Sequence, residues 1–224
     1  MKKSSVERKV IGTSVEGTSI EAWKIGHQGE IIHFYGGFHG DEPEGVEIAL
    51  KLKDYLIQHD ADLFQNKIVL IVPLVNPDGY KNKTRVNSHK VDLNRNFPTK
   101  DWTKEALEPK YYPGPKPASE PEVRAILDLM DQFYPQKIIS FHSLIPHQLN
   151  YDGPAKKLAE AMSCYNHYPV TDHIGYPTPG SLGNYAGQER NIALITYELP
   201  EKISKEKAWE ESKEALLEAI RFVL

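Results

Sequence analysis

The sequence predicts an α/β fold, a three-layer sandwich in which helices cover both faces of a mixed, mostly parallel sheet. Two observations favour this class. Segments rich in β-branched and aromatic residues alternate along the chain with amphipathic segments of helical period. One of the strand-like segments, residues 67–75, is almost entirely apolar, as expected for a strand buried on both faces. The length of 224 residues favours one domain spanning 1–224.

Five segments are expected to form strands, because each is short and rich in valine, isoleucine or aromatic residues. They are residues 20–25, 30–35, 67–75, 137–141 and 191–197. In folds with a parallel sheet, functional sites gather at the carboxyl ends of the strands. The residues that follow these strands are therefore the first candidates for chemistry.

Four segments are expected to form helices, since apolar residues recur in them at intervals of three or four. They are residues 44–58, 119–133, 154–165 and 204–224. The second opens with Ser119 and carries Glu122 three residues later, a pattern typical of a capping box. Cys164 falls in the third helix and is interpreted as a buried structural thiol. Residues 76–119 form a long irregular region, in which a short element could lie; loops of this length are usually functional or disordered.

Charge and hydropathy exclude several classes of protein. The chain has 27 Lys and Arg against 31 Asp and Glu, a net charge of −4, so no nucleic acid is expected as a partner. The longest apolar stretch, residues 68–75, is far shorter than the roughly 20 residues of a membrane-spanning helix. The N-terminal MKKSSVERKV lacks the apolar region of a signal peptide, and one cysteine cannot form an intrachain disulfide. These features favour the cytoplasm and leave the oligomeric state open.

Three segments place ionisable side chains at the ends of predicted strands. In GGFHGDE the glycines allow a sharp turn after the strand, and His39 and Glu42 follow close enough together to share one ion. His142 in SFHS and Glu198 in TYELP end two further strands. Two histidines and a glutamate form many catalytic zinc sites, with a fourth position open for water, and a further carboxylate would be the general base. The sequence has no nucleophile elbow, phosphate-binding loop or HExxH motif that would favour another chemistry.

These segments together resemble the zinc carboxypeptidases of the funnelin type, over about residues 12–200. The segments HGDE, SFHS and TYELP carry the resemblance, as do NPDGY at 76–80 and VDLNRNFP at 91–98. The resemblance implies one zinc ion (Zn2+) per chain, held by His39, Glu42 and His142. It also implies that Glu198 is the catalytic glutamate.

The same resemblance assigns roles to four residues of the irregular region. Arg85 would polarise the scissile carbonyl. Asp92 would hydrogen-bond a zinc-ligand histidine, which fixes the tautomer and orientation of the ring. Asn94 and Arg95 would bind the terminal carboxylate of the substrate, a group that a guanidinium fork fits well.

Within the family, the segments GGFHGDEPEG, VDLNRNFP and GYPTPGSLGNYAG most resemble the bacterial murein peptide amidases. Those enzymes cut the γ-D-glutamyl–diaminopimelate bond of cell-wall peptides. Tyr176 falls where the family keeps a mobile tyrosine that caps the substrate. Gly183 and Asn184 would line the side-chain pocket, where a small residue leaves room for diaminopimelate. The expected partner is a small peptide with a free C-terminal carboxylate.

Three other functions stay open at this point. A general carboxypeptidase on ordinary peptides is one alternative, although Asp41 stands where digestive carboxypeptidases carry a substrate-contacting arginine, a difference that argues against ordinary peptides. A zinc deacylase similar to succinylglutamate desuccinylase and aspartoacylase is another, although NPDGY, TYELP and Tyr176 favour a peptidase. The third is a non-catalytic domain that binds peptide carboxylates, against which Glu198 and the complete ligand set argue.

Overall fold

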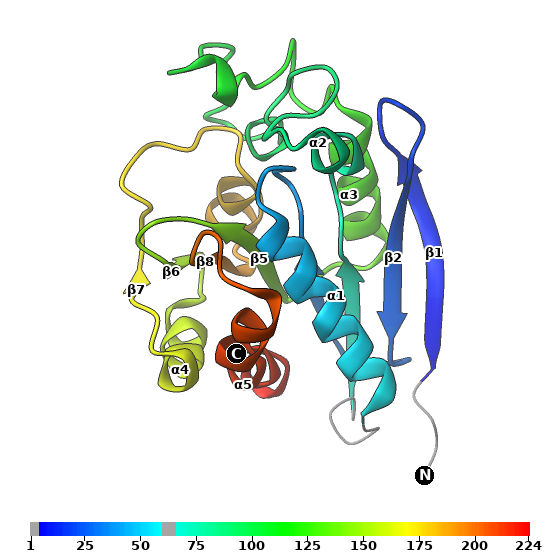
Figure 1. The fold of residues 1–224 in the computed structure, drawn as a ribbon, viewed down its shortest axis with the longest axis vertical. Coiled ribbons are helices and arrows are strands. Elements are labelled where there is room, and N and C mark those ends of the chain that lie inside the picture. The colour runs from blue at the N-terminus through cyan, green and yellow to red at the C-terminus, as the bar shows by residue number, and fades with distance from the viewer. Residues whose placement is uncertain (1–4, 60–65) are drawn as a thin grey trace.

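A computed structural model describes residues 5–59 and 66–224. Residues 1–4, where the segment examined for a signal peptide begins, lie outside the described residues. The described chain contains one eight-stranded sheet with the order β1-β2-β4-β3-β5-β8-β6-β7 (Figure 1). The strands are β1 Val6–Thr13, β2 Ser19–Ile25, β3 Glu30–Tyr35, β4 Lys67–Val72, β5 Lys137–Ser143, β6 Gln148–Asp152, β7 Val170–Thr171 and β8 Ala193–Leu199. Strands β4, β3, β5 and β8 run parallel in the centre. The antiparallel pairings lie toward the edges, so the predicted mixed, mostly parallel sheet is confirmed.

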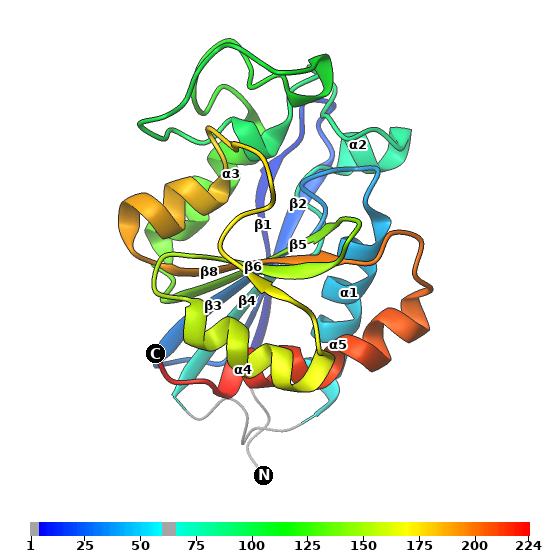
Figure 2. The same ribbon diagram turned by 90° about the vertical axis from the view of Figure 1, so that its left-hand side faces the viewer.

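Helices cover both faces of this sheet. They are α1 Pro43–Gln58, α2 Pro77–Asn82, α3 Pro121–Gln132, α4 Lys156–Asn166 and α5 Lys205–Arg221, with a short π-helical segment at Gly183–Gln188. Apolar residues of α1, α4 and α5 form one core with one face of the sheet. Residues of α3 and of the π-helical segment form a second core with the other face. Figure 2, which looks along the sheet, shows these three layers.

The central strands position the functional segments. β3, β5 and β8 are neighbours and parallel, so their carboxyl ends meet at one edge of the sheet. In the register of β5 and β8, His142 is the Cα partner of Glu198. Two side chains that lie 56 positions apart in the sequence are thereby fixed one strand spacing apart, about 4.8 Å between the backbones.

Several sequence expectations are corrected at the ends of elements. The strand expected over 67–75 ends at Val72, because Pro73 follows and cannot donate to the ladder. The helix expected from Ser119 begins at Pro121, with Glu120 as N-cap and no side-chain cap hydrogen bond, so the capping box is wrong. The Ser119 hydroxyl instead donates to Glu120 Oε1, at 2.6 Å. The region 76–119 contains three short elements, namely α2 and two 3-10 helices at Leu93–Arg95 and Pro109–Tyr111.

Cys164 is exposed, not buried as the sequence analysis expected. The buried positions of α4 are Leu158, Ala159, Met162 and Asn166, one stripe of the helix, and Cys164 lies off that stripe. The apolar character of cysteine was a weaker guide than helical phase.

No helix within 5–59 and 66–224 is long and apolar enough to cross a membrane.

Candidate active site

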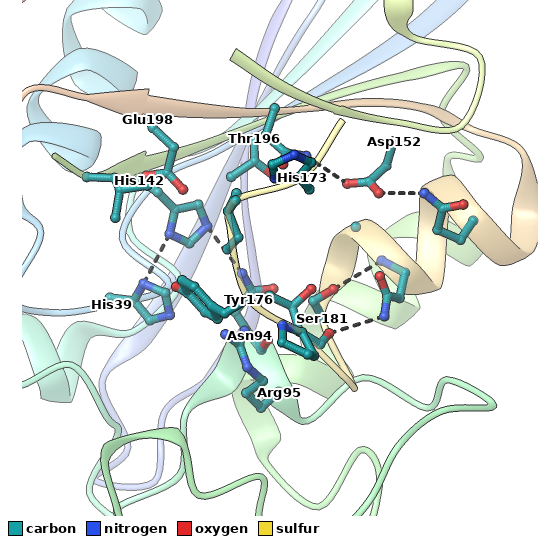
Figure 3. Close-up of a pocket in the computed structure, with 18 of the residues that line it drawn as sticks. His39, Asn94, Arg95, His142, Asp152, His173, Tyr176, Ser181, Thr196 and Glu198 are labelled. Atoms are coloured by element: carbon teal, nitrogen blue, oxygen red, sulfur yellow. Dashed lines mark hydrogen bonds between the residues drawn. The ribbon is translucent and has the colours of Figure 1, made fainter. Parts of the chain in front are cut away.

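The residues singled out from the sequence meet at the carboxyl edge of the sheet, around a cavity of about 360 Å³. His39 and Glu42 come from the turn between β3 and α1, His142 from the end of β5 and Glu198 from the end of β8. Arg85, Asn94 and Arg95 come from the irregular region after β4, and Tyr176 and Gly183 from the segment before β8. Figure 3 shows the labelled members of this group around the cavity. All but Asp92, which lies behind His39, line the cavity itself.

His39, Glu42 and His142 bring together three ligand atoms of the kind that zinc prefers. Their donor atoms all lie within 4.8 Å of one another. The Nδ1 atoms of the two histidines are 3.0 Å apart. Glu42 reaches both rings: its Oε1 lies 2.8 Å from Nδ1 of His39, and its Oε2 lies 3.0 Å from Nδ1 of His142. Both histidines are almost fully buried, at 3% exposed. Nitrogen and carboxylate atoms that converge so closely in a buried place are a suitable donor set for a divalent cation.

Asp92 connects the histidine pair to Arg85. Its Oδ1 lies 3.1 Å from His39 Nε2, and Arg85 Nε donates to its Oδ2 over 3.0 Å. Arg85 also donates to Glu42, at 3.3 Å. Burial alone would raise the pKa of Asp92, but the charges of His39 and Arg85 hold it well below its usual value. A carboxylate behind a ligating histidine fixes the ring so that the other nitrogen faces the ion, which supports the fit to zinc.

Glu198 has a buried carboxylate oxygen, Oε2, that has no hydrogen-bond partner among the described residues. The residue is 5% exposed and lines the cavity beside His142. Burial, and then the charge of Glu42, raise the pKa of Glu198 to about 8. A divalent cation among the neighbouring ligands would lower this pKa again. An unpartnered buried carboxylate facing a cavity is suited to exchange a proton with a bound molecule.

Asn94, Arg95 and Tyr176 form the cationic and aromatic side of the cavity. Arg95 donates to the carbonyl of Asn94, at 2.7 Å, and its guanidinium lies 6.0 Å from the ring of Tyr176. Asn94 Oδ1 accepts from the backbone N–H of Leu182, at 2.9 Å, so Asn94 joins the irregular region to the segment that contains Gly183. Tyr111 lies against both arginines, 5.5 Å from Arg95 and 5.2 Å from Arg85. The sequence analysis did not identify Tyr111.

The structure adds polar side chains that sequence reasoning missed at the far side of the cavity. Gly183 and Asn184 line the cavity together with Asp101, Asn150, Asp152, Gln188 and Thr196. A signal for two of them exists in QLNYD, residues 148–152, where polar and apolar side chains alternate with the period of a strand. The strand itself was not predicted, because five residues with three polar side chains resemble a loop.

The zinc carboxypeptidase family matches residues 1–214, and the chain belongs to this family. It is therefore a hydrolase of the metallopeptidase class, which confirms the peptidase prediction and the resemblance noted in the sequence. Its family is zinc-dependent, in agreement with the donor set of His39, Glu42 and His142.

Two proteins are similar to the chain in sequence, and two solved structures are similar to it in fold. Murein peptide amidase A of Vibrio campbellii is 33% identical over 180 residues, which are 73% of this chain and 67% of that protein. Murein peptide amidase A of Escherichia coli K12 is 32% identical over 197 residues, 83% of this chain and 77% of that protein. The crystal structure of murein-tripeptide amidase from Escherichia coli O157 superposes with a TM-score of 0.77 at 28% identity, covering 100% of this chain and 99% of that one. Carboxypeptidase A of Helicoverpa armigera, at 22% identity, shares the fold with a TM-score of 0.85 over 96% of this chain and 68% of its own.

Proposed function

We propose that this protein is a zinc-dependent murein peptide amidase, which hydrolyses the γ-D-glutamyl–diaminopimelate bond and releases the C-terminal residue. One observation carries the proposal: a single cavity joins the His39–Glu42–His142 cluster and the unpartnered carboxylate of Glu198 to the buried guanidinium of Arg95. That combination suits a substrate with a carboxylate close to the cleaved bond.

Each residue has a role that follows from its position. A zinc ion held by His39, Glu42 and His142 would supply the Lewis acid of the reaction. Glu198 accepts a proton from the attacking water and passes it to the leaving amine. Arg85 contributes positive charge where the carbonyl oxygen becomes negative.

The leaving residue is held by other groups. Asn94 and Arg95 bind its carboxylate through charge-assisted hydrogen bonds, which are stronger than those between neutral groups. Tyr176 covers the bound residue, since it lies in the exposed segment between β7 and β8 and faces the cavity.

The murein substrate is supported by likeness and by shape. The amidases of Vibrio campbellii and Escherichia coli are about one-third identical to this chain over most of its length. Gly183 and Asn184 line the same cavity, on the side where a long leaving side chain would extend. We place the reaction in the cytoplasm. The chain has one cysteine and forms no intrachain disulfide, which is usual for proteins of that reducing compartment. Cell fractionation tests this location.

The test is hydrolysis of a peptide panel by the zinc-loaded protein, with the products identified by mass. The panel contains L-Ala-γ-D-Glu-diaminopimelate, its α-linked isomer, and an ordinary α-linked peptide with an apolar C-terminal residue. We expect the highest kcat/KM for the γ-linked diaminopimelate peptide, and loss of activity with a chelator. The highest kcat/KM for the apolar peptide would favour a general carboxypeptidase and refute the murein substrate. Activity on acylated amino acids alone would favour the deacylase alternative.

A further inference from the structure

Arg95 differs from the other arginine of the cavity in its partners. Arg85 forms ion pairs with Glu42, at 3.3 Å, and with Asp92, at 3.0 Å. The guanidinium of Arg95 donates to the backbone carbonyl of Asn94, over 2.7 Å, and forms no ion pair with any residue that the structure describes. Arg95 is nevertheless buried, at 5% exposed. A buried guanidinium without a carboxylate partner needs another source of negative potential.

Two aromatic rings lie against the Arg95 guanidinium. Its central carbon is 5.5 Å from the centroid of the Tyr111 ring and 6.0 Å from that of Tyr176. The two rings are also neighbours, with centroids 6.0 Å apart and planes inclined by 36°. Figure 3 shows Arg95 close to Tyr176 on the wall of the cavity. The face of an aromatic ring is partly negative and attracts a cation within about 6 Å, so the two rings supply the missing potential.

A ring has an advantage over a carboxylate as the partner of an arginine that binds a substrate. A carboxylate of the protein would accept hydrogen bonds from the N–H groups of the guanidinium, which are the groups that recognise a substrate carboxylate. A ring attracts the cation as a whole and does not have to accept these N–H groups. Arg95 is thereby held in place while most of its donors stay available for a ligand.

The position of the Tyr111 ring is set by the region of the chain that carries Arg95. Tyr111 ends the 3-10 helix Pro109–Tyr111. The carbonyl of the next residue, Tyr112, accepts from the backbone N–H of Asp92 over 2.8 Å. Asp92 is three residues before Arg95, so a short backbone path connects the ring with the guanidinium that it contacts.

Two further cations lie near the Tyr111 ring but do not depend on it. Arg85 is 5.2 Å from the ring centroid, and its two ion pairs already fix its position. Lys110 is 4.9 Å from the centroid, but its side chain is 53% exposed and is paired with Glu108. Water screens the charge of such an exposed group. Loss of the ring should therefore act mainly on Arg95, and so on binding more than on the polarised carbonyl.

We propose that Tyr111 is a positioning residue, whose ring holds Arg95 and Tyr176 where they receive the terminal carboxylate of the substrate. This inference rests on the proposed function only in its assignment of carboxylate binding to Arg95. It adds that the carboxylate site is formed before the substrate binds, by aromatic contacts instead of an ion pair. The ring of Tyr111, and not its hydroxyl group, is the part that acts.

The kinetic test compares a variant that loses the ring with one that keeps it. With the zinc-loaded protein and L-Ala-γ-D-Glu-diaminopimelate, Tyr111→Leu should raise KM about three- to thirtyfold, while kcat stays within about threefold. The inhibition constant of the same peptide amidated at its C-terminus should not change. Tyr111→Phe should keep KM within about twofold of the wild type. Tyr165→Leu, the same change at an exposed position of α4, is the matched control and should alter neither constant.

A spectroscopic measurement tests the contact itself. In proton–nitrogen correlation spectra, the Arg95 Nε–H signal is identified by its loss in Arg95→Lys. The neighbouring rings should displace this signal in the wild type, and in Tyr111→Leu it should move toward the position of an exposed arginine. An undisplaced signal in the wild type would overturn the inference, even if Tyr111→Leu did not fold.

The kinetic results distinguish failure of this inference from failure of the proposed function. An unchanged KM in Tyr111→Leu, a fall in kcat instead of a rise in KM, or equal impairment of Tyr111→Leu and Tyr111→Phe would overturn the role of the ring. If the wild type cleaves no peptide, or binds free and amidated peptides equally well, the proposed function fails. The displacement of the Arg95 signal then decides alone whether Tyr111 holds Arg95.

Discussion

Replacing Asp92 by asparagine should weaken zinc binding and, independently, destabilise the metal-free protein. The Asp92 carboxylate is fully buried and serves His39 with one oxygen and Arg85 with the other. Asparagine offers one oxygen and one amide nitrogen. Whichever way the amide is turned, a donor then faces either the His39 ring nitrogen or the Arg85 Nε–H.

The two losses have different expected sizes. Outer partners of metal-binding histidines typically contribute about 10–100-fold to metal affinity. Removing one partner of a buried ion pair typically costs about 3–5 kcal/mol, and the 18% exposure of Arg85 places this pair near the lower end. A loss of about 3 kcal/mol in a protein of this size corresponds to a fall in Tm of about 6–12 °C.

Two measurements separate the effects. Competition with a chelator gives the zinc affinity of the wild type and of Asp92→Asn, and thermal unfolding in excess chelator gives the stability of the metal-free forms. Asp128→Asn, an exposed change of the same kind, is the matched control. A variant that binds zinc within about twofold of the wild type and melts at the same temperature would refute both parts of the reasoning.

Three further predictions address the catalytic base, the carboxylate site and the amino end of the sheet. Glu198→Gln should retain zinc but lose about 10²–10⁴-fold in kcat, because the amide cannot accept a proton; activity within threefold of the wild type would exclude Glu198 as the base. Arg95→Ala should weaken peptides with a free C-terminal carboxylate roughly ten- to a hundredfold and amidated ones much less, as inhibition constants would show; equal losses would rule out carboxylate binding. Lys137 is buried beside Glu30, and burial lowers its pKa to about 8. Between pH 8 and 10 the unfolded chain keeps this proton while the folded protein has released it, so wild-type stability should rise relative to Lys137→Met by about 2–3 kcal/mol in urea titrations; parallel pH profiles would contradict this.

The central sheet and the catalytic residues were predictable from the sequence because strong local patterns mark them. The apolar strands stand out by composition, and His39, Glu42, His142 and Glu198 follow from the rule that sites lie at the carboxyl ends of parallel strands. Spacing alone did not show which of these residues bind zinc and which one is the general base. The family resemblance made that distinction.

The far wall of the cavity was not predictable in the same way. Asp152 lies on a five-residue strand without an apolar run, and Gln188 lies in a π-helical segment, for which single sequences give no clear periodic signal. Their meeting depends on the antiparallel pairing of β6 with β8, a contact decided by tertiary packing. The outer strand β1, with mostly exposed residues, was missed for the same lack of an apolar pattern.

The pairing of His142 with Glu198 in the register of β5 and β8 makes correct folding and catalytic competence inseparable. Side chains alternate along a strand, so a slip of β8 by one residue would turn Glu198 away from the cavity and bring Tyr197 toward it. Tyr197 is held on the opposite face by the core around α4 and by a 2.8 Å hydrogen bond from Asn166. Tyr197, which takes no part in the chemistry, thus helps to fix the register of β8. In variants that weaken its packing, we expect some molecules to be wholly inactive and the others fully active, instead of every molecule being equally slowed.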